Sequence, residues 1–551
     1  MQQIIECVPN FSEGNDLNII KEITDEIEAV EGARLLNVDP GKATNRTVVT
    51  FVGSPQAVVE AAFRAIKRAG ELIDMSKHKG EHPRMGATDV CPLIPVSNIS
   101  MEETAGWAQK LAKRIGEELL LPVYLYESAQ PKKERSNLSA IRAGEYEGFS
   151  KKIKLPEWKP DFGPAEFDAR RGATVIGARD FLVAYNVNLN TTSVRRANAV
   201  AFDIREAGRK VKNEKGEEVV QPGSLKCVKA IGWYIEEYGI SQISINLTNI
   251  DVTPMHIAFD EACKKAEARG LRVTGSELVG LIPLKAMLDA GKYFLKKQKR
   301  SVGVSEKELI RIAVISMGLD ELAPFKPEEK IIEYMLMDKS DNKLVSMNLS
   351  DFADETASES PAPGGGSIAA YMGALGVSLG TMVANLSSHK KGWDERWEEF
   401  SKWAEKGQQY KNELVRLVDA DTRAFNKIMD AFSLPKSTNE EKATRKLAIQ
   451  EATKQAIEIP FAVMQNAFGS MEVIMAMAAG GNPNSVSDAG VGALCARSAV
   501  IGAFMNVRIN AAGYENKDFV NDIIAKGKDI ENKAIEAEKA ILQIVNEKIG
   551  L

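Results

Sequence analysis

The sequence predicts a multidomain protein, in which an N-terminal α/β part built from two βαββαβ-type subdomains precedes an all-α helical-bundle domain. Three observations carry this prediction. The chain has 551 residues, which exceeds the size of one ordinary domain. Strand-like and helical patterns alternate over roughly the first 325 residues, as they do in α/β proteins. A segment rich in Pro and Gly at 361–367 then opens a region that is helical almost throughout.

The first α/β subdomain is predicted from short apolar runs separated by amphipathic stretches. The strand-like runs are IIECVP at 4–9, RLLNVD at 34–39, RTVVTFVG at 46–53 and PVYLYE at 122–127. The helical stretches are 15–29, 55–74 and 101–118. Ser54 and Pro55 form a favourable N-cap and first-turn pair for the second of these helices.

A second series with the same order of elements begins near residue 174. Strand-like patterns cover 174–190, 227–236 and 241–252, and helical patterns cover 193–208 and 253–270. We therefore predict two subdomains at 1–178 and 179–326, a linker at 327–345 and an all-α domain at 346–551.

Composition and charge exclude some classes of function. The net charge is −5 and the isoelectric point about 5.8, whereas a general nucleic-acid binder needs a basic face. The N-terminal stretch has no secretory-signal pattern. We expect a cytoplasmic protein that binds no nucleic acid. Widely spaced cysteines argue against a Cys-rich zinc site or a disulfide framework; they are Cys7, Cys91, Cys227, Cys263 and Cys495.

The uncharged stretch at 367–388 is long enough to cross a bilayer. Gly376 and Gly380 stand at GxxxG spacing within it. Polar residues dilute its hydrophobicity, and no basic cluster flanks its N-terminal side. We therefore expect a helix buried in a bundle or a dimer interface, without a membrane span.

The stretch KHKGEHPRMG at 77–86 contains two of the four histidines. His78 and His82 have the i,i+4 spacing of a helical metal pair, but Gly80 and Pro83 disfavour the helix that this arrangement needs. Two alternatives remain: a loop histidine that bonds backbone, or acid–base catalysis by His82. The charged neighbours expected to tune its pKa and hold an anionic substrate are Lys79, Glu81 and Arg84. The role of His78 stays open.

Two further segments are candidates for binding or catalysis. Asp39 ends a predicted strand, where a carboxylate either faces the site or caps the following turn. The sequence PAPGGGS at 361–367 lacks the GK[ST] ending of a nucleotide P-loop. Its free N–H groups at the start of a helix can instead receive an anion or a carbonyl.

Asp421 is the most informative residue of the helical part. It fills a gap in the apolar stripe of the helix at 412–432, whose members are Leu414, Val418, Phe425, Ile428 and Phe432. Asp419 is expected on the more polar side of this helix. A carboxylate in an apolar stripe either pairs with a neighbouring helix or acts as a proton acceptor with a raised pKa.

A third cluster, GNPNSVSDAG at 481–490, precedes a helix rich in small residues. Its polar side chains either cap that helix or bind the edge of a polar heterocycle. They are Asn482, Asn484, Ser485 and Asp488.

Several long stretches together resemble the formimidoyltransferase-cyclodeaminase family over essentially the whole chain. These stretches are ECVPNFSEG at 6–14, NVDPGKATNRTVVTFVG at 37–53, DMSKHKGEHPRMGATDVCP at 74–92, AIRAGEYEG at 140–148, PDFGPAEF at 160–167, GSELVGLIPLKA at 275–286, PFKPEEKIIEY at 324–334, APGGGS at 362–367 and LVDADTRAF at 417–425. The helical part is also similar to stand-alone methenyltetrahydrofolate cyclohydrolases.

The resemblance implies a bifunctional folate enzyme of histidine degradation. The α/β part would transfer the formimino group of N-formimino-L-glutamate to N5 of tetrahydrofolate. The helical part would cyclise 5-formiminotetrahydrofolate to 5,10-methenyltetrahydrofolate and release ammonia. Tetrahydrofolate, polyglutamated, would be a cosubstrate, no metal would be needed, and the protein would be a homo-oligomer.

The resemblance also assigns site residues. It places the transferase histidine at His82 and the cyclodeaminase proton acceptor at Asp421, with Asp419 as the second candidate. In the chemistry that this implies, Asp39 would orient that histidine or bind a substrate amine. The resemblance places one folate-binding segment at Gly163, Pro164, Ala165, Glu166, Phe167, Asp168, Ala169, Arg170, Arg171 and Gly172. It places the other at Arg195, Arg196, Ala197, Asn198, Ala199, Val200, Ala201, Phe202 and Asp203. The expected cyclodeaminase pocket combines Gly364, Gly365, Gly366 and Ser367 with Asn482, Asn484, Ser485 and Asp488.

Two alternatives remain at this point. One is a formylglutamate-dependent formyltransferase with cyclohydrolase activity in the helical part. The other is a folate-binding scaffold without catalysis.

Overall fold

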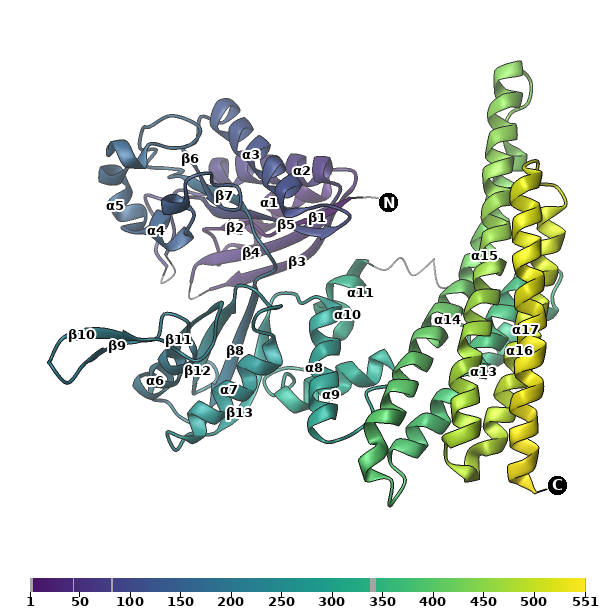
Figure 1. The fold of residues 1–551 in the computed structure, drawn as a ribbon. Coiled ribbons are helices and arrows are strands. Elements are labelled where there is room, and N and C mark those ends of the chain that lie inside the picture. The colour runs from purple at the N-terminus through teal and green to yellow at the C-terminus, as the bar shows by residue number, and fades with distance from the viewer. Residues whose placement is uncertain (1–2, 43, 81–82, 337–342, 551) are drawn as a thin grey trace. The chain divides into compact units, whose positions relative to one another are not determined.

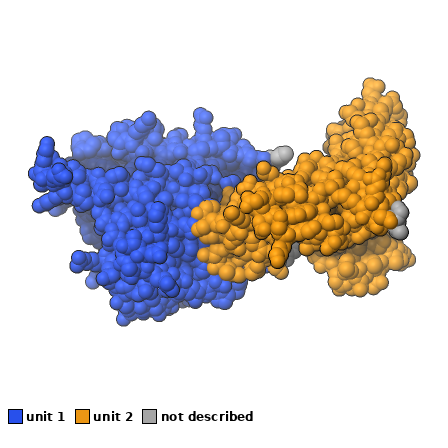
Figure 2. Space-filling view, turned by 60° about the horizontal axis from the view of Figure 1, so that its bottom comes forward, with its two compact units in different colours: residues 1–286, 317–335 blue, residues 287–316, 336–551 orange. Residues whose placement is uncertain are grey.

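A computed structural model describes residues 3–42, 44–80, 83–336 and 343–550 of the chain. The chain forms two compact units, which Figure 2 shows in different colours. Unit 1 comprises residues 1–286 and 317–335, and unit 2 comprises residues 287–316 and 336–551.

Unit 1 contains a seven-stranded mixed sheet and a four-stranded antiparallel sheet (Figure 1). The strands of the first sheet are β1 (Ile4–Cys7), β2 (Asn10–Phe11), β3 (Ala33–Gly41), β4 (Arg46–Gly53), β5 (Thr88–Ser97), β6 (Val123–Glu127) and β7 (Thr174–Ala178). β1 and β2 both lie between β4 and β5, and β3 pairs with β4 on the outside. Among the described residues of this sheet, the only parallel pairings join β7 to β5 and to β6.

Three long helices cover the first sheet because their apolar faces match its buried side chains. They are α1 (Leu17–Glu28), α2 (Pro55–Leu72) and α3 (Met101–Glu118). Ile5, Phe51 and Val58 belong to this core. Ser54 caps α2 and Pro55 begins it, as the sequence predicts. Two short helices, α4 (Leu138–Arg142) and α5 (Glu145–Lys152), follow β6.

The second sheet has the strand order β11-β12-β8-β13. Its strands are β8 (Val183–Leu189), β11 (Val228–Ile235), β12 (Ile240–Leu247) and β13 (Val273–Val279), and its helices are α6 (Val194–Ile204) and α7 (Met255–Glu267). The second subdomain therefore has the predicted β-α-β-β-α-β order. The first contains it as β1-α1-β3-β4-α2-β5, in which β5 is a strand that is not predicted, and adds β2, α3, β6 and β7. A hairpin of β9 (Arg209–Lys212) and β10 (Glu218–Gln221), which the sequence analysis does not anticipate, is inserted after α6.

The predicted strand over 174–190 is in fact two strands, because β7 completes the first sheet and β8 starts the second. Residues 179–182 connect them. The continuous apolar pattern hides this change of sheet, since a strand buried in either sheet has the same composition.

Four helices follow the second sheet along the chain: α8 (Leu284–Lys297), α9 (Glu306–Met317), α10 (Pro327–Lys330) and α11 (Ile332–Leu336). Residues 287–316 group with unit 2 rather than with the α/β part. Ser401 accepts a hydrogen bond from the Val302 backbone at 3.0 Å, and Lys292 pairs with Glu405. The structure therefore divides the chain differently from the predicted boundary at 326, while the linker at 327–345 stays a prediction.

The rest of unit 2 is a bundle of helices, as predicted (Figure 1). Its members are α12 (Leu349–Ala357), α13 (Gly365–Ser388), α14 (Trp397–Ser433), α15 (Asn439–Gly480), α16 (Val486–Ala511) and α17 (Lys517–Ile549). Small residues bring α13 and α16 close together: a Cβ on Gly376 would lie 2.8 Å from the Gly492 carbonyl oxygen.

By length and composition alone, α13, α15 and the stretch Pro483–Ala511 are apolar enough to cross a membrane. Between 50% and 61% of each apolar window is buried inside the protein. The absence of a membrane span stays a prediction.

Candidate active sites

The loop that carries the two histidines lies in unit 1 between α2 and β5. His82 and Glu81 lie outside the described residues. His78 is held by backbone and side chain together: Nε2 lies 2.9 Å from the Asn45 carbonyl oxygen, and Nδ1 accepts a hydrogen bond from Arg84 Nε at 3.1 Å. This arrangement matches the neutral imidazole with its proton on Nε2. His78 therefore fastens the loop.

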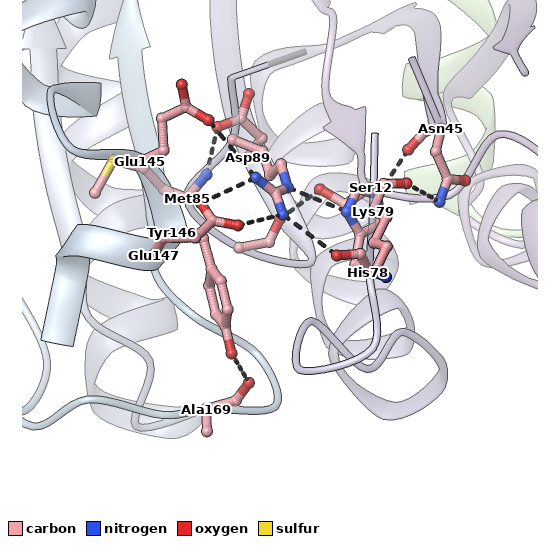
Figure 3. A network of polar contacts seen from close by, with 12 residues as sticks. Ser12, Asn45, His78, Lys79, Met85, Asp89, Glu145, Tyr146, Glu147 and Ala169 are labelled. Carbon is pink, nitrogen blue, oxygen red and sulfur yellow. Dashed lines mark hydrogen bonds and ion pairs between the residues drawn. The ribbon is translucent and has the colours of Figure 1, made fainter. Parts of the chain in front are cut away.

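The expectation that Arg84 holds an anionic substrate stays a prediction, and in this structure Arg84 pairs with a carboxylate of the chain itself. Its guanidinium donates to both carboxylate oxygens of Glu147, at 2.7 and 3.1 Å, and its side chain is only 8% exposed. The pair lowers the pKa of Glu147. Figure 3 shows this network, in which Asn45 and Lys79 also take part. Lys79 alone among the described charged neighbours is exposed.

A second, buried ion pair fixes the far end of the loop. Asp89 is fully buried on β5 and pairs with Arg142 through both carboxylate oxygens. Its Oδ1 also accepts the Met85 backbone N–H at 3.0 Å. The stretch at 140–148 therefore anchors the histidine loop twice, through Arg142 and through Glu147.

The first predicted folate segment, 163–172, lies directly against this loop. Met75 N–H donates to the Arg170 carbonyl and Ala87 N–H to the Arg171 carbonyl, each at 2.8 Å. Tyr146 points toward Ala169 in Figure 3 and donates its hydroxyl to that carbonyl. The structure thus places the segment against the described ends of the histidine loop.

The backbone requires glycine at two positions of this segment. Gly163 and Gly172 both have positive φ, and a Cβ on either would overlap a backbone carbonyl, that of Leu121 or of Met85. The turn between them is further held by Asp168, which pairs with Arg171 at 2.6 Å. These residues shape the segment whatever it binds.

The second predicted folate segment, 195–203, coincides with most of α6. Ala197, Val200 and Ala201 are buried in the core beneath the second sheet, so these side chains face away from solvent. Asn198 exchanges two hydrogen bonds with the Gly232 backbone. Only exposed members such as Arg195 and Arg196 remain accessible to a ligand. Among the described residues, no hydrogen bond or ion pair joins α6 to the histidine loop.

Asp39 lies on β3, opposite Val48 of β4, and is half-buried. Burial raises the pKa of Asp39, the Lys330 ammonium opposes the rise, and the Glu277 carboxylate adds to it. Glu277 is on β13 of the second sheet and Lys330 is on α10. Among described residues, none donates a hydrogen bond to the Asp39 side chain. Asp39 therefore faces charged groups of the second subdomain and does not cap its own turn.

The sequence analysis misses a polar network on the second sheet around Glu277. Asn186 and Gln242 each donate to Glu277 Oε2 at 3.2 Å, and Gln242 also donates to Asn188 at 2.8 Å. These side chains lie on the face opposite α6 and α7, since the alternate residues of β8 and β12 fill the core. Polar residues at i and i+2 of a strand are the signal that could have identified this face.

Glu6 is a second residue that the sequence analysis misses. It is 4% exposed on β1. Burial raises the pKa of Glu6 to about 7, Arg179 opposes the rise, and Glu333 adds to it. A carboxyl group with this pKa can exchange a proton at neutral pH.

The Asp421 site in unit 2 is built where the first turn of α13 meets the middle of α14. Ser367 donates its hydroxyl to the Val418 carbonyl at 2.9 Å and lies 3.2 Å from Asp421 Oδ2. Burial raises the pKa of Asp421, and hydrogen bonds from the Ser367 side chain and backbone oppose the rise. Among the described residues, no Lys or Arg forms an ion pair with it. Asp421 thus has the properties of a proton acceptor.

The glycine run before α13 makes room for this carboxylate. A Cβ on Gly366 would overlap the Asp421 carboxylate, whereas a Cβ on Gly364 would have only the Pro361 carbonyl oxygen nearby, at 3.8 Å. The helix N-terminus can approach Asp421 only because residue 366 has no side chain.

Asp419 is buried, contrary to the expected position on a polar face. It is 5% exposed, and its two oxygens accept the backbone N–H groups of Leu344 (2.8 Å) and Val345 (3.1 Å). The segment before α12 covers it, which the pattern of α14 alone does not reveal. Asp419 therefore anchors a chain segment, and Asp421 is the carboxylate available for chemistry.

The apolar stripe proposed for α14 is only partly correct. Leu414 and Val418 are buried, but Phe425 is 37% and Phe432 51% exposed. The C-terminal part of α14 buries Ala424 instead. Asp421 is therefore covered by the start of α13. The apolar residues of α14 that follow it in the predicted stripe do not bury it.

The expected cyclodeaminase pocket is not assembled within one chain. Gly364–Ser367 lie at the N-terminal end of α13, while Asn482 donates its backbone N–H to Ser387 at the other end. Ser387 is twenty positions after Ser367 along this helix, a rise of about 30 Å. Asn482 caps the turn into α16, which is the capping alternative. Asn484, Ser485 and Asp488 belong to the same end.

Within the described parts of the chain, no three His, Cys, Asp or Glu side chains gather in a way that could hold a metal ion.

Comparison with known proteins identifies the family. The model of the formiminotransferase domain, N-terminal subdomain, matches residues 4–179, that of the formiminotransferase domain 184–338, and that of formiminotransferase-cyclodeaminase 348–529. The architecture is thus that of a transferase module followed by a cyclodeaminase module.

Curated relatives extend this match over nearly the full length. Formimidoyltransferase-cyclodeaminase of Gallus gallus is 47% identical, covering 94% of each chain, and that of Dictyostelium discoideum is 41% identical over all of both. Glutamate formimidoyltransferase of Thermoplasma acidophilum is 42% identical over 53% of this chain and 92% of its own. The chain belongs to the formimidoyltransferase-cyclodeaminase family.

Proposed function

We propose that the protein is a bifunctional folate enzyme. It transfers the formimino group of N-formimino-L-glutamate to N5 of tetrahydrofolate, then cyclises the product to 5,10-methenyltetrahydrofolate with release of ammonia. The observation that carries the proposal is the identity of 41–47% to bifunctional relatives across both units. The alternative with a formyl donor has no such support.

In the transfer step, N5 of tetrahydrofolate attacks the formimino carbon. The N5–C bond forms, the bond from carbon to the glutamate nitrogen breaks, and the N5 proton passes to that nitrogen. We assign this proton transfer to His82, whose loop is fastened at both ends by the His78–Arg84 and Asp89–Arg142 contacts. Asp39 is assigned to orient the histidine or the substrate amine.

In the cyclisation step, N10 attacks the same carbon. The N10–C bond forms, and the N10 proton passes to Asp421. Asp421 then returns a proton to the amino group, the bond from carbon to that nitrogen breaks, and ammonia leaves. Burial favours protonation of Asp421, and Ser367 fixes its orientation. Asp419, the second candidate, accepts the backbone N–H groups of Leu344 and Val345, and we assign it to holding that segment.

Other features belong to the proposal. Tetrahydrofolate is the cosubstrate, and we infer that it carries a polyglutamate tail and that neither reaction needs a metal. We also propose a cytoplasmic homo-oligomer. Support for self-association comes from exposed apolar side chains on two adjacent helices, namely Leu375, Met382 and Leu386 on α13 with Val491 and Leu494 on α16.

Reciprocal variants test the proposal. His82→Ala is expected to abolish transfer while cyclisation of supplied 5-formiminotetrahydrofolate continues. Asp421→Ala is expected to do the reverse. Both activities are measured on the same preparations, by glutamate release and by methenyl formation. Transfer near the wild-type rate in His82→Ala would refute the assignment of that residue.

A further inference from the structure

The polar network on the second sheet surrounds one carboxylate, Glu277. The Tyr238 hydroxyl lies 3.4 Å from Oε1, and the Asn186 and Gln242 amides each lie 3.2 Å from Oε2. Gln242 is in turn oriented by the Trp233 indole N–H, at 3.2 Å. Four side chains from three strands and a turn therefore hold this carboxylate in one place, which a merely solvated glutamate does not need.

No positive charge neutralises this carboxylate. Among the described residues, neither Glu277 nor Asp39 forms an ion pair with Lys or Arg, and all the donors to Glu277 are uncharged. Asp39, on the first sheet, lies close enough to Glu277 for the Glu277 carboxylate to raise the pKa of Asp39, while the Lys330 ammonium lowers the pKa of Asp39. One oriented carboxylate with a second carboxylate near it forms a site suited to a cationic group.

The two possible donors differ in this respect. The formimino group is an amidine, which is protonated at neutral pH and presents N–H groups in one plane, much as a guanidinium does. The formyl group of formylglutamate is neutral, and its oxygen only accepts hydrogen bonds. A carboxylate therefore attracts the protonated formimino group and repels the oxygen of the formyl group.

We propose that Glu277, together with Asp39, binds the amidinium of the donor and makes the transferase specific for formimino over formyl groups. Glu277 is a specificity-determining residue for the proposed reaction, and the inference rests on the proposed function. The positive charge is present on the donor and again on the 5-formimino product, so the carboxylates stay matched to the group while N5 replaces the glutamate nitrogen. No proton enters or leaves at Glu277.

The test compares N-formimino-L-glutamate with N-formyl-L-glutamate in the full-length protein. In Glu277→Gln, kcat/KM for the formimino donor is expected to fall by about 100-fold, mostly through KM, because a charged hydrogen-bonding partner is lost. The value for the formyl donor is expected to stay level or rise, since the repulsion is removed. The KM for tetrahydrofolate is expected to be unchanged.

Two further variants separate specificity from folding. Glu277→Asp keeps the charge and is expected to retain at least ten times more of the donor preference than Glu277→Gln. Glu206→Gln removes a carboxylate of the same subdomain that accepts the Cys227 backbone N–H at 2.8 Å, and the donor preference should not change.

The outcomes are distinct. An unchanged donor ratio in Glu277→Gln, or an equal loss for both donors, overturns the inference while leaving the proposed function intact. A wild-type protein that transfers neither group refutes the proposed function itself.

Discussion

The two sites hold their carboxylates in different ways. In unit 1, Asp39 and Glu277 come from two sheets, and amide and hydroxyl donors orient Glu277. In unit 2, Asp421 stands alone in a largely buried position beneath the first turn of α13. A carboxylate pair favours binding a cation, whereas one buried carboxylate with a raised pKa favours accepting a proton. The difference matches the two reactions, because only the transfer step must recognise a donor that is then released as glutamate.

The same contrast exists between neighbours on α14. Asp419 and Asp421 are two residues apart, yet backbone N–H groups saturate the first and leave the second with a single serine. Asp419 is thus a structural residue, and Asp421 is the one whose proton affinity is raised.

The strongest expected effect concerns the glycine beneath Asp421. In Gly366→Ala the new methyl group overlaps the Asp421 carboxylate, which must move out of position. We expect cyclisation to fall by about 100-fold or more, as for loss of general-base catalysis, with transfer unaffected. Gly364→Ala is the matched control, because its methyl group meets no atom closer than 3.8 Å. Equal activity of the two variants would contradict the geometry.

Replacing Asp419 should affect stability instead of chemistry. Asp419→Asn loses the charge on two backbone hydrogen bonds and turns one acceptor into a donor. We expect a loss of about 3 kcal/mol in the free energy of unfolding of unit 2, measured by urea titration. Cyclisation per folded molecule should remain near wild type. A selective loss of cyclisation without destabilisation would exchange the roles of the two aspartates.

A smaller effect is expected from Glu6 in unit 1. Its pKa in the folded protein is raised to about 7, so its contribution to stability is complete below its unfolded pKa of 4.5 and is lost as pH rises through 7. Between about pH 5.5 and 7.5 the wild type should lose about 2 kcal/mol that Glu6→Gln does not lose. Urea unfolding at the two pH values measures this difference. Parallel pH dependence of both proteins would show that Glu6 titrates normally.

Much of the fold follows from the sequence because its periodicities are strong. The α/β order, the helical bundle and the cap at Ser54 are predicted from local patterns and are confirmed. The division of 174–190 between two sheets is not predicted, because both strands have the same buried composition. The grouping of 287–316 with unit 2 depends on contacts such as Val302 with Ser401, which are distant in sequence.

The candidate sites were harder to predict than the fold. Asp421 is apparent in the sequence because its charge interrupts an apolar stripe. The glycine run is apparent because it comes directly before an apolar helix. The neutralisation of Arg84 by Glu147, the covering of Asp419 and the Glu277 network all depend on residues that are brought together only by folding. The proposed union of 364–367 with 482–488 fails within one chain, because composition does not reveal which end of α13 each segment meets.

The most direct test of two separate sites is the fate of the intermediate in Asp421→Asn. Formiminoglutamate and tetrahydrofolate are supplied together, and glutamate release and methenyl formation are followed in the same sample. We expect glutamate release at the wild-type rate, accumulation of 5-formiminotetrahydrofolate, and methenyl formation slowed by about 100-fold or more. Methenyl formation at the wild-type rate, or a parallel fall in glutamate release, would contradict the account.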